Sequence, residues 1–191
     1  YLYCLHIVYT ILYIMLMINL ELHDIGYLFL RLGIAYIYLH GVFMLGSTKK
    51  RRVIGIKRTS ILFSSISKSF LFDIVTKLSF YIALLLMSSG SILILSGVSV
   101  KIGSFLLILF TIPAIIVHKR ESARSKDLSD SILQNINSEF QYDVEHLANL
   151  SHAGHRSSGN KNYMLLAVNF YLLLREESTD LINIYHLLSL F

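Results

Sequence analysis

The stretch IGYLFLRLGIAYIYLHGVFMLG, residues 25–46, decides the fold class. It is nearly unbroken apolar sequence of about 22 residues, enough for a helix to cross a hydrocarbon core of roughly 30 Å. One full charge, that of Arg31, lies inside it. A guanidinium at membrane depth is costly, so it normally has a specific partner or a function. The stretch therefore predicts a membrane helix in which Arg31 needs an explanation.

The composition of the whole chain also indicates a membrane protein. The 191 residues are 54% hydrophobic and 15% charged, whereas soluble domains carry about 25% charged residues. The single cysteine, Cys4, excludes an internal disulfide and an all-cysteine metal site. Residues 1–20 lack the basic start and the small-residue cleavage site of a signal peptide, so we interpret residues 2–20 as a membrane helix.

The net charge of +5 is concentrated in two basic groups that adjoin apolar stretches. This placement is typical of loops retained on the positive side of a membrane, and it argues against a nucleic-acid partner. We predict that these side chains contact the headgroups of anionic lipids such as cardiolipin. They are Lys49, Lys50, Arg51, Arg52, Lys57, Arg58, Lys119 and Arg120.

Hydropathy divides the chain into membrane segments joined by short connections. Residues 1–24 predict an additional N-terminal membrane helix followed by an acidic outer turn. Residues 25–117 predict three further membrane helices, with a basic loop at 47–58 and a short interfacial helix at 59–69. With both basic groups inside, every connection alternates correctly between the two sides of the membrane.

The rest of the chain is a polar insert, residues 118–162, and a last membrane segment with an amphipathic tail, residues 163–191. Apolar residues recur every three or four positions in the insert, which predicts an amphipathic helix over 127–150 on the membrane surface or against a partner. Whether 163–174 crosses fully is open, because its apolar run is short. The predicted fold is an all-α integral membrane bundle of four to five transmembrane helices with a surface amphipathic helix.

Arg31 has two interpretations, functional and structural. Ser88 and Ser89 are expected at a similar depth, so the three side chains could bind a polar ligand or a quinone carbonyl. Alternatively, Arg31 is a structural arginine bonded to serines and backbone carbonyls, or directed outward to Asp24.

The histidines form two sets with metal-binding potential. His6, His40 and His118 are expected near the inner interface, where two imidazoles on facing helices could ligate haem b. The alternative is a set of interfacial histidines bonded to headgroups. A second set, His146, His152 and His155 with Glu145, has loose spacing and fits either zinc or a solvated loop. The chain has no nucleotide-binding glycine loop, nucleophile elbow or HExxH pattern, so we predict no catalytic residues and no resident metal.

Three pieces of the sequence, in order, resemble the DoxX-like family of small multi-pass membrane proteins. They are LFLRLGIAYIYLHG (28–41), SSGSILILSGVSVKIGSFLLILFTIPAIIVHK (88–119) and KNYMLLAVNFYLLL (161–174). The residues that carry the resemblance are Arg31, Gly41, Gly90, Gly97, His118 and Asn162. The resemblance implies a four-helix membrane core and a place among components of membrane oxidoreductase assemblies, such as those of quinone-linked sulfur oxidation.

The chain departs from that family at two places. Met87 stands where the family usually has an acidic residue, and Ala167 and Val168 replace a Gly-Gly pair. Loss of the acidic residue disfavours a catalytic role, because the resemblance implies that it offsets the buried arginine.

We therefore expect a non-catalytic subunit of a larger respiratory or redox complex in a mitochondrial or bacterial inner membrane. It would contribute assembly and lipid contacts, with other membrane subunits as partners and no resident cofactor. The alternatives are a quinone- or haem-binding electron-transfer anchor, and a small-solute transporter or cargo receptor. Transporters commonly contain internal repeats and helices broken near the midplane, and neither is visible in this sequence.

Overall fold

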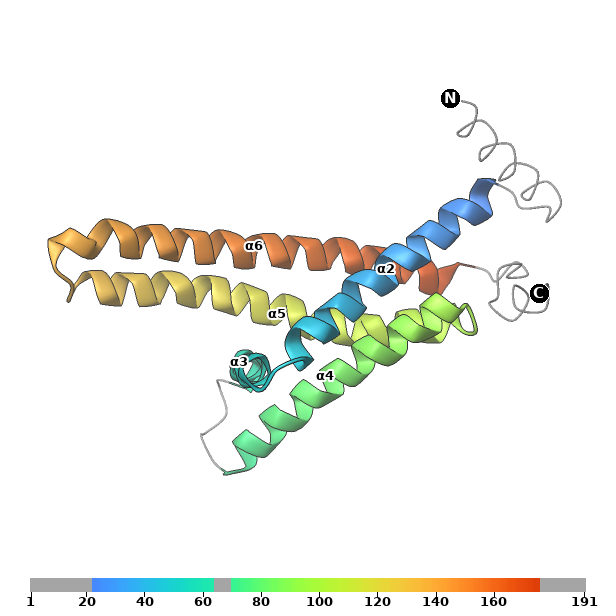
Figure 1. Cartoon of the computed structure of the whole chain (residues 1–191), viewed down its shortest axis with the longest axis horizontal. Coiled ribbons are helices and arrows are strands. Elements are labelled where there is room, and N and C mark those ends of the chain that lie inside the picture. The colour runs from blue at the N-terminus through green and yellow to red at the C-terminus, as the bar shows by residue number, and fades with distance from the viewer. Residues whose placement is uncertain (1–21, 64–69, 176–191) are drawn as a thin grey trace.

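The computed structural model describes residues 22–63 and 70–175, and the regular structure in these ranges is entirely helical. The helices are α2 (Leu22–Gly46), α3 (Lys49–Thr59), the 3-10 helix η1 (Ser60–Phe63), α4 (Phe70–Ser96), α5 (Val100–Leu133) and α6 (Ser138–Leu174) (Figure 1). Three of them contain segments long and apolar enough to cross a membrane, namely Asp24–Gly46, Leu71–Ser96 and Val100–Leu133. By length and composition the chain is a multi-pass membrane protein, which confirms the all-α membrane prediction. The predicted helix over 2–20 and the tail from 176 onward lie outside the described residues.

The architecture is a long antiparallel hairpin of α5 and α6, with α2 and α4 beside one part of it (Figure 1). The start of α2, the end of α4, the start of α5 and the end of α6 gather around Gly97, and we call this the Gly97 end. α3 lies at the opposite end of α2 and beside α4, whose first turns continue past it, and we call this region the α3 end (Figure 1). Beyond the α3 end, α5 and α6 continue as an outer hairpin without α2 or α4 (Figure 1).

α4 and α5 cross at a point where only glycine fits. A Cβ built on Gly90 would lie 2.9 Å from the carbonyl oxygen of Gly103, and one on Gly103 would lie 2.7 Å from that of Gly90. Small residues of this kind let helix backbones approach closely in lipid, where packing holds helices together. From the crossing the two helices diverge toward the α3 end (Figure 1). α3 and η1 contact both helices there.

The basic segment predicted as a loop over 47–58 is mostly helix α3, so that prediction was wrong. Thr48 caps the helix, because its hydroxyl accepts a hydrogen bond from the Arg51 backbone N–H at 3.2 Å. Lysine and arginine are good helix formers, and a low hydropathy does not distinguish a polar helix from a loop. Of the interfacial helix expected over 59–69, residues 60–63 are the 3-10 helix η1 and 64–69 lie outside the described residues.

The predicted single surface helix over 127–150 was also wrong. α5 continues to Leu133, the chain turns, and α6 begins at Ser138 with Asn137 in an extended conformation. The apolar rhythm runs through the turn because both arms are amphipathic, so periodicity alone hides the break. Serines hold the arms together, with the Ser125 and Ser151 hydroxyls 2.9 Å apart.

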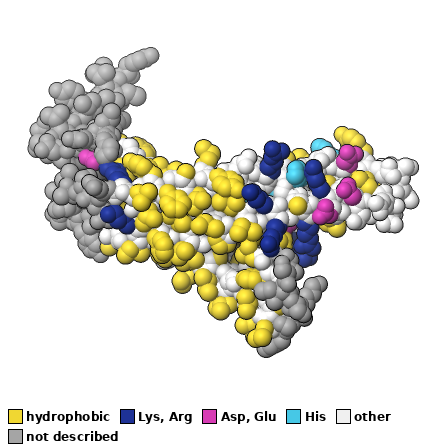
Figure 2. Space-filling model, turned by 180° about the vertical axis from the view of Figure 1, so that it is seen from behind, with side chains coloured by type: hydrophobic (Ala, Val, Ile, Leu, Met, Phe, Trp, Pro, Cys, Tyr) yellow, Lys and Arg dark blue, Asp and Glu magenta, His cyan; other side chains and the backbone are white. Residues whose placement is uncertain are grey.

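The types of side chain on the surface also change along the length of the molecule. Figure 2 shows hydrophobic side chains over the part that contains the apolar spans, then a zone of Lys and Arg, then acidic side chains toward the tip of the outer hairpin. Phe29, Phe43 and Leu85 on the spans are 64–69% exposed. Large apolar side chains at this exposure fit lipid rather than water as their surroundings.

Candidate functional site

Arg31 lies at the Gly97 end and is 2% exposed. Its Nε donates to the carbonyl oxygen of Ile94 at 2.8 Å, and its Nη2 donates to that of Leu95 at 3.2 Å. These carbonyls belong to the last turn of α4, where helix carbonyls lack an intrahelical partner and the helix dipole favours a cation. The side chain therefore closes the end of α4 from the neighbouring helix α2.

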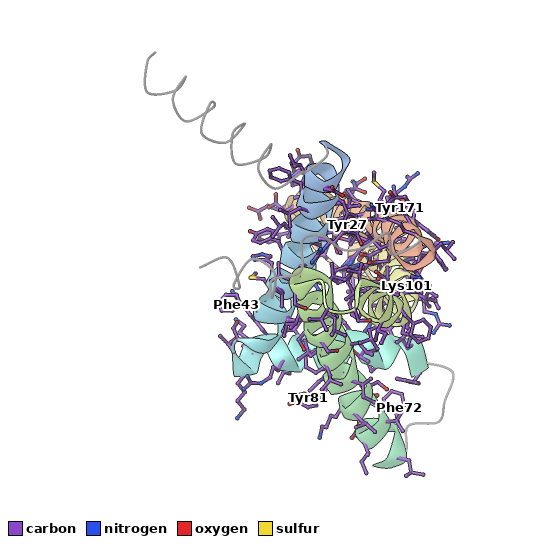
Figure 3. All side chains as sticks on the ribbon, turned by 90° about the vertical axis from the view of Figure 1, so that its right-hand side faces the viewer. Tyr27, Phe43, Phe72, Tyr81, Lys101 and Tyr171 are labelled. Atoms are coloured by element: carbon purple, nitrogen blue, oxygen red, sulfur yellow. The ribbon has the colours of Figure 1, made fainter. Side chains whose placement is uncertain are left out.

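The residues around Arg31 also take part in packing the helices. Gly97 has φ +73°, and a Cβ there would contact the Arg31 guanidinium. Figure 3 views the bundle from this end, with Tyr27 between α2 and α6. The Arg31 guanidinium lies 5.6 Å from the centroid of the Tyr27 ring, and the Arg175 guanidinium lies 3.8 Å from it. The same ring thus links α2 with the end of α6.

Ser88 and Ser89 do not join Arg31. Both hydroxyls donate to the carbonyl oxygen of Leu85 within α4, at 3.1 and 2.7 Å, whereas Arg31 donates to the carbonyls of Ile94 and Leu95. The α4 groups that Arg31 contacts are backbone carbonyls, which cannot be recognised from the polar side chains in the sequence. The sequence signal for them was Gly97, which marks the end of α4.

A second buried polar group joins three helices, and the sequence interpretation missed it. The Tyr38 hydroxyl of α2 lies 2.6 Å from the Thr111 hydroxyl of α5, and Asn169 Nδ2 of α6 donates to Tyr38 at 2.8 Å. Asn169 Oδ1 is buried without a hydrogen-bond partner in the described part of the chain. Asn169 in an apolar run was the available signal, because an amide in lipid needs a partner. The group fixes α6 against α2 and α5.

Two of the predicted headgroup ligands, Arg52 and Arg120, donate to backbone carbonyls of the protein. Arg52 donates to the carbonyl oxygen of Gly46 at 2.7 Å, and Arg120 donates to those of Ile61 and Leu62 at 2.7 and 3.2 Å. Arg51 donates to the Ser47 hydroxyl at 2.9 Å, and Lys119 lies 5.4 Å from the Tyr163 ring centroid. Lys49, Lys50, Lys57 and Arg58 are exposed.

A cavity of about 520 Å³ opens between the diverging helices at the α3 end. Its walls come from α4 and α5, and α3 with η1 closes it on another side. Four polar side chains take part in a lining that is otherwise apolar or glycine: Arg58, Thr59, Ser79 and His118. Ligand pockets are commonly of this size and composition. The cavity follows from the crossing at Gly90 and Gly103, because helices that touch at one point must separate away from it.

His118 and His155 form a pair beside this cavity, with their Nδ1 atoms 3.3 Å apart. Burial lowers the pKa of the His155 imidazole, and Arg58 adds to this effect while Glu121 opposes it. Two imidazoles on one tetrahedral metal ion at bond lengths of about 2.0 Å would also hold the nitrogens roughly 3.3 Å apart. A metal site needs further ligands, however, and among the described residues no third His, Cys, Asp or Glu joins this pair. As placed, this is a hydrogen-bonded pair, with one imidazole neutral.

The other predicted histidine ligands lie elsewhere. His6 is outside the described residues, and exposed His40 stacks on Tyr36 with ring centroids 5.9 Å apart. His146 stacks on Tyr142, and His152 Nδ1 lies 2.8 Å from the Ser122 hydroxyl. Among the described residues, no group of three or more His, Cys, Asp or Glu is placed to hold a metal ion.

Searches against family models, curated proteins and solved structures found no significant match for this chain. The resemblance to the DoxX-like family therefore stays a prediction.

Proposed function

We propose that this chain is a non-catalytic, multi-pass subunit of a larger membrane complex, respiratory or redox in kind, in a mitochondrial or bacterial inner membrane. Four crossings would be made by α2, α4, the first half of α5 and the last part of α6. The bond from Asn169 to Tyr38 supports the α6 crossing, because it joins α6 to the interior of a candidate span. The DoxX-like resemblance supports the redox part.

The observation that carries the proposal is the outer hairpin. It extends past α2 and α4 and presents large apolar side chains to its surroundings (Figure 1). On α6, Phe140, Leu147 and Leu150 are 50–65% exposed at helical spacing. On α5, Leu128 and Ile132 are also exposed. A polar helical hairpin that keeps such a stripe outside the bilayer is suited to packing against another subunit.

The buried polar groups support the non-catalytic part. Arg31 binds the end of α4, and Tyr38 binds Thr111 and Asn169. These hydrogen bonds connect helices, so the buried polar groups serve to hold the bundle together. The quinone- or haem-binding alternative needs Arg31 or His40 directed at a ligand, and their contacts speak against it.

The test is co-purification from native membranes. The tagged full chain is extracted in a mild detergent, and the polypeptides that accompany it are identified by mass spectrometry. We expect defined partner subunits, lost in a Leu147→Gln, Leu150→Gln variant and kept in a Glu145→Gln control on the same helix. A stable monomer without accompanying subunits would refute the proposal, as would release of the chain from membranes by carbonate.

A further inference from the structure

The cavity between α4 and α5 has an apolar interior and a cationic mouth, and this combination limits its occupant. Phe110 and Ala114 of α5 and Phe80 and Ala83 of α4 belong to its apolar lining. Of the polar lining residues, Arg58 and Thr59 come from the C-terminal part of α3, and His118 lies where the apolar part of α5 ends. The fourth, Ser79, comes from α4. A ligand that fits has a long apolar part and one polar end.

The charges around the mouth select an anion. Arg58 is exposed and lines the cavity, and its charge acts on both His118 and His155. Lys161 of α6 also acts on His118, while Glu121 is the acidic group whose charge acts on His155. Arg52 and Arg120 are held by carbonyls, and among the described residues Arg58 has no hydrogen bond of that kind.

We infer that this cavity binds one acyl chain of an anionic phospholipid, with the phosphate of its headgroup at Arg58. The inference rests on the proposed membrane placement, because it puts the α3 end at the headgroup level. Basic pockets between helices on the positive side of a membrane hold phospholipid headgroups in this way. Arginine matches a phosphate with two parallel N–H donors, which explains a preference for a phosphate over a neutral head. A bound lipid would also fill the space that the diverging helices leave open.

The experiment uses the purified full chain in micelles that contain equal amounts of phosphatidylglycerol and phosphatidylcholine with identical acyl chains. Native mass spectrometry counts the lipids retained by each chain. We expect one retained phosphatidylglycerol per chain, favoured over phosphatidylcholine at least fivefold. Arg58→Gln should abolish this preference, whereas Lys57→Gln, its exposed neighbour, should keep it.

Cavity filling tests the acyl part separately. Ala114→Phe should displace the retained lipid, and Ala83→Phe, from the opposite wall, gives the same test if the first variant does not fold. Ala167→Phe places the same ring on the exposed face of α6, away from the cavity, and should retain the lipid. Equal retention of the two lipids, retention in both filled variants, or a neutral molecule such as a quinone in the cavity would overturn the inference. These outcomes leave co-purification of partner subunits unaffected, so the two proposals fail separately.

Discussion

Replacing Arg31 by glutamine tests whether the buried guanidinium is structural. The change removes two hydrogen bonds, of 2.8 and 3.2 Å, from a charged donor to the Ile94 and Leu95 carbonyls. Bonds to a charged group contribute about 1.5–3 kcal/mol each, and the last turn of α4 is left with orphan carbonyls. Water at this end of the bundle can satisfy part of that loss. We therefore expect the free energy of unfolding to fall by about 2–4 kcal/mol.

The measurement is reversible unfolding in mixed micelles, followed by helical circular dichroism as denaturing detergent is added. Arg51→Gln is the matched control, because that side chain bonds to a neighbouring serine at the surface and should change stability by less than about 0.5 kcal/mol. Gly97→Ala should resemble the Arg31 variant, since its Cβ would contact the guanidinium at a positive φ. If Arg31→Gln unfolds like wild type but alters binding of a ligand, the structural interpretation is wrong.

Three further predictions concern the helix contacts. Gly103→Ala should destabilise the folded chain by about 1–3 kcal/mol, because its Cβ would meet the backbone of α4. Gly154→Ala, whose Cβ would have nothing within 4 Å, should stabilise the folded chain by about 1 kcal/mol. Equal effects of the two variants on unfolding in micelles would contradict the close crossing. Tyr38→Phe should cost about 1–3 kcal/mol because it leaves the buried amide of Asn169 without its acceptor, and Asn169→Leu should cost less in the same assay. Because burial lowers the pKa of His155, the unfolded chain binds more protons below pH 6.5, so stability should fall as the pH drops through that value. His155→Gln should flatten this part of the pH profile of the unfolding midpoint, and an unchanged profile would contradict it.

The fold class followed from the sequence because long apolar runs have few physical alternatives. Residues 25–46 are apolar apart from a few positions such as Arg31, and a helix is the spanning element that satisfies its own backbone. The basic segment was harder, because α3 is polar around most of its circumference and low hydropathy suits both a loop and a helix. The turn near Asn137 was hidden for a related reason, since two amphipathic arms can share one rhythm.

The candidate site was less accessible from the sequence because it depends on how helices rotate and diverge. Depth along a helix predicted Arg31 near Ser88, but depth does not say which face a side chain occupies. The cavity at Arg58 has no sequence pattern of its own, since its lining comes from five elements and its shape from a distant glycine contact. The residue types predicted a headgroup contact at Arg58, and the structure shows in addition the apolar cavity that Arg58 lines.

The polar groups that hold the helices together lie in a different part of this molecule from the one that faces the cavity. At the Gly97 end, Arg31 and Tyr27 join α2 to α4 and α6, and in the middle Tyr38 joins α2 to α5 and α6. A substitution at either place must therefore disturb helix packing before it can disturb any ligand. At the α3 end, Arg58 faces a cavity that no helix fills. An unfilled apolar space in lipid gains contacts when an acyl chain enters it, so this end is where a variant can lose binding while the bundle stays folded.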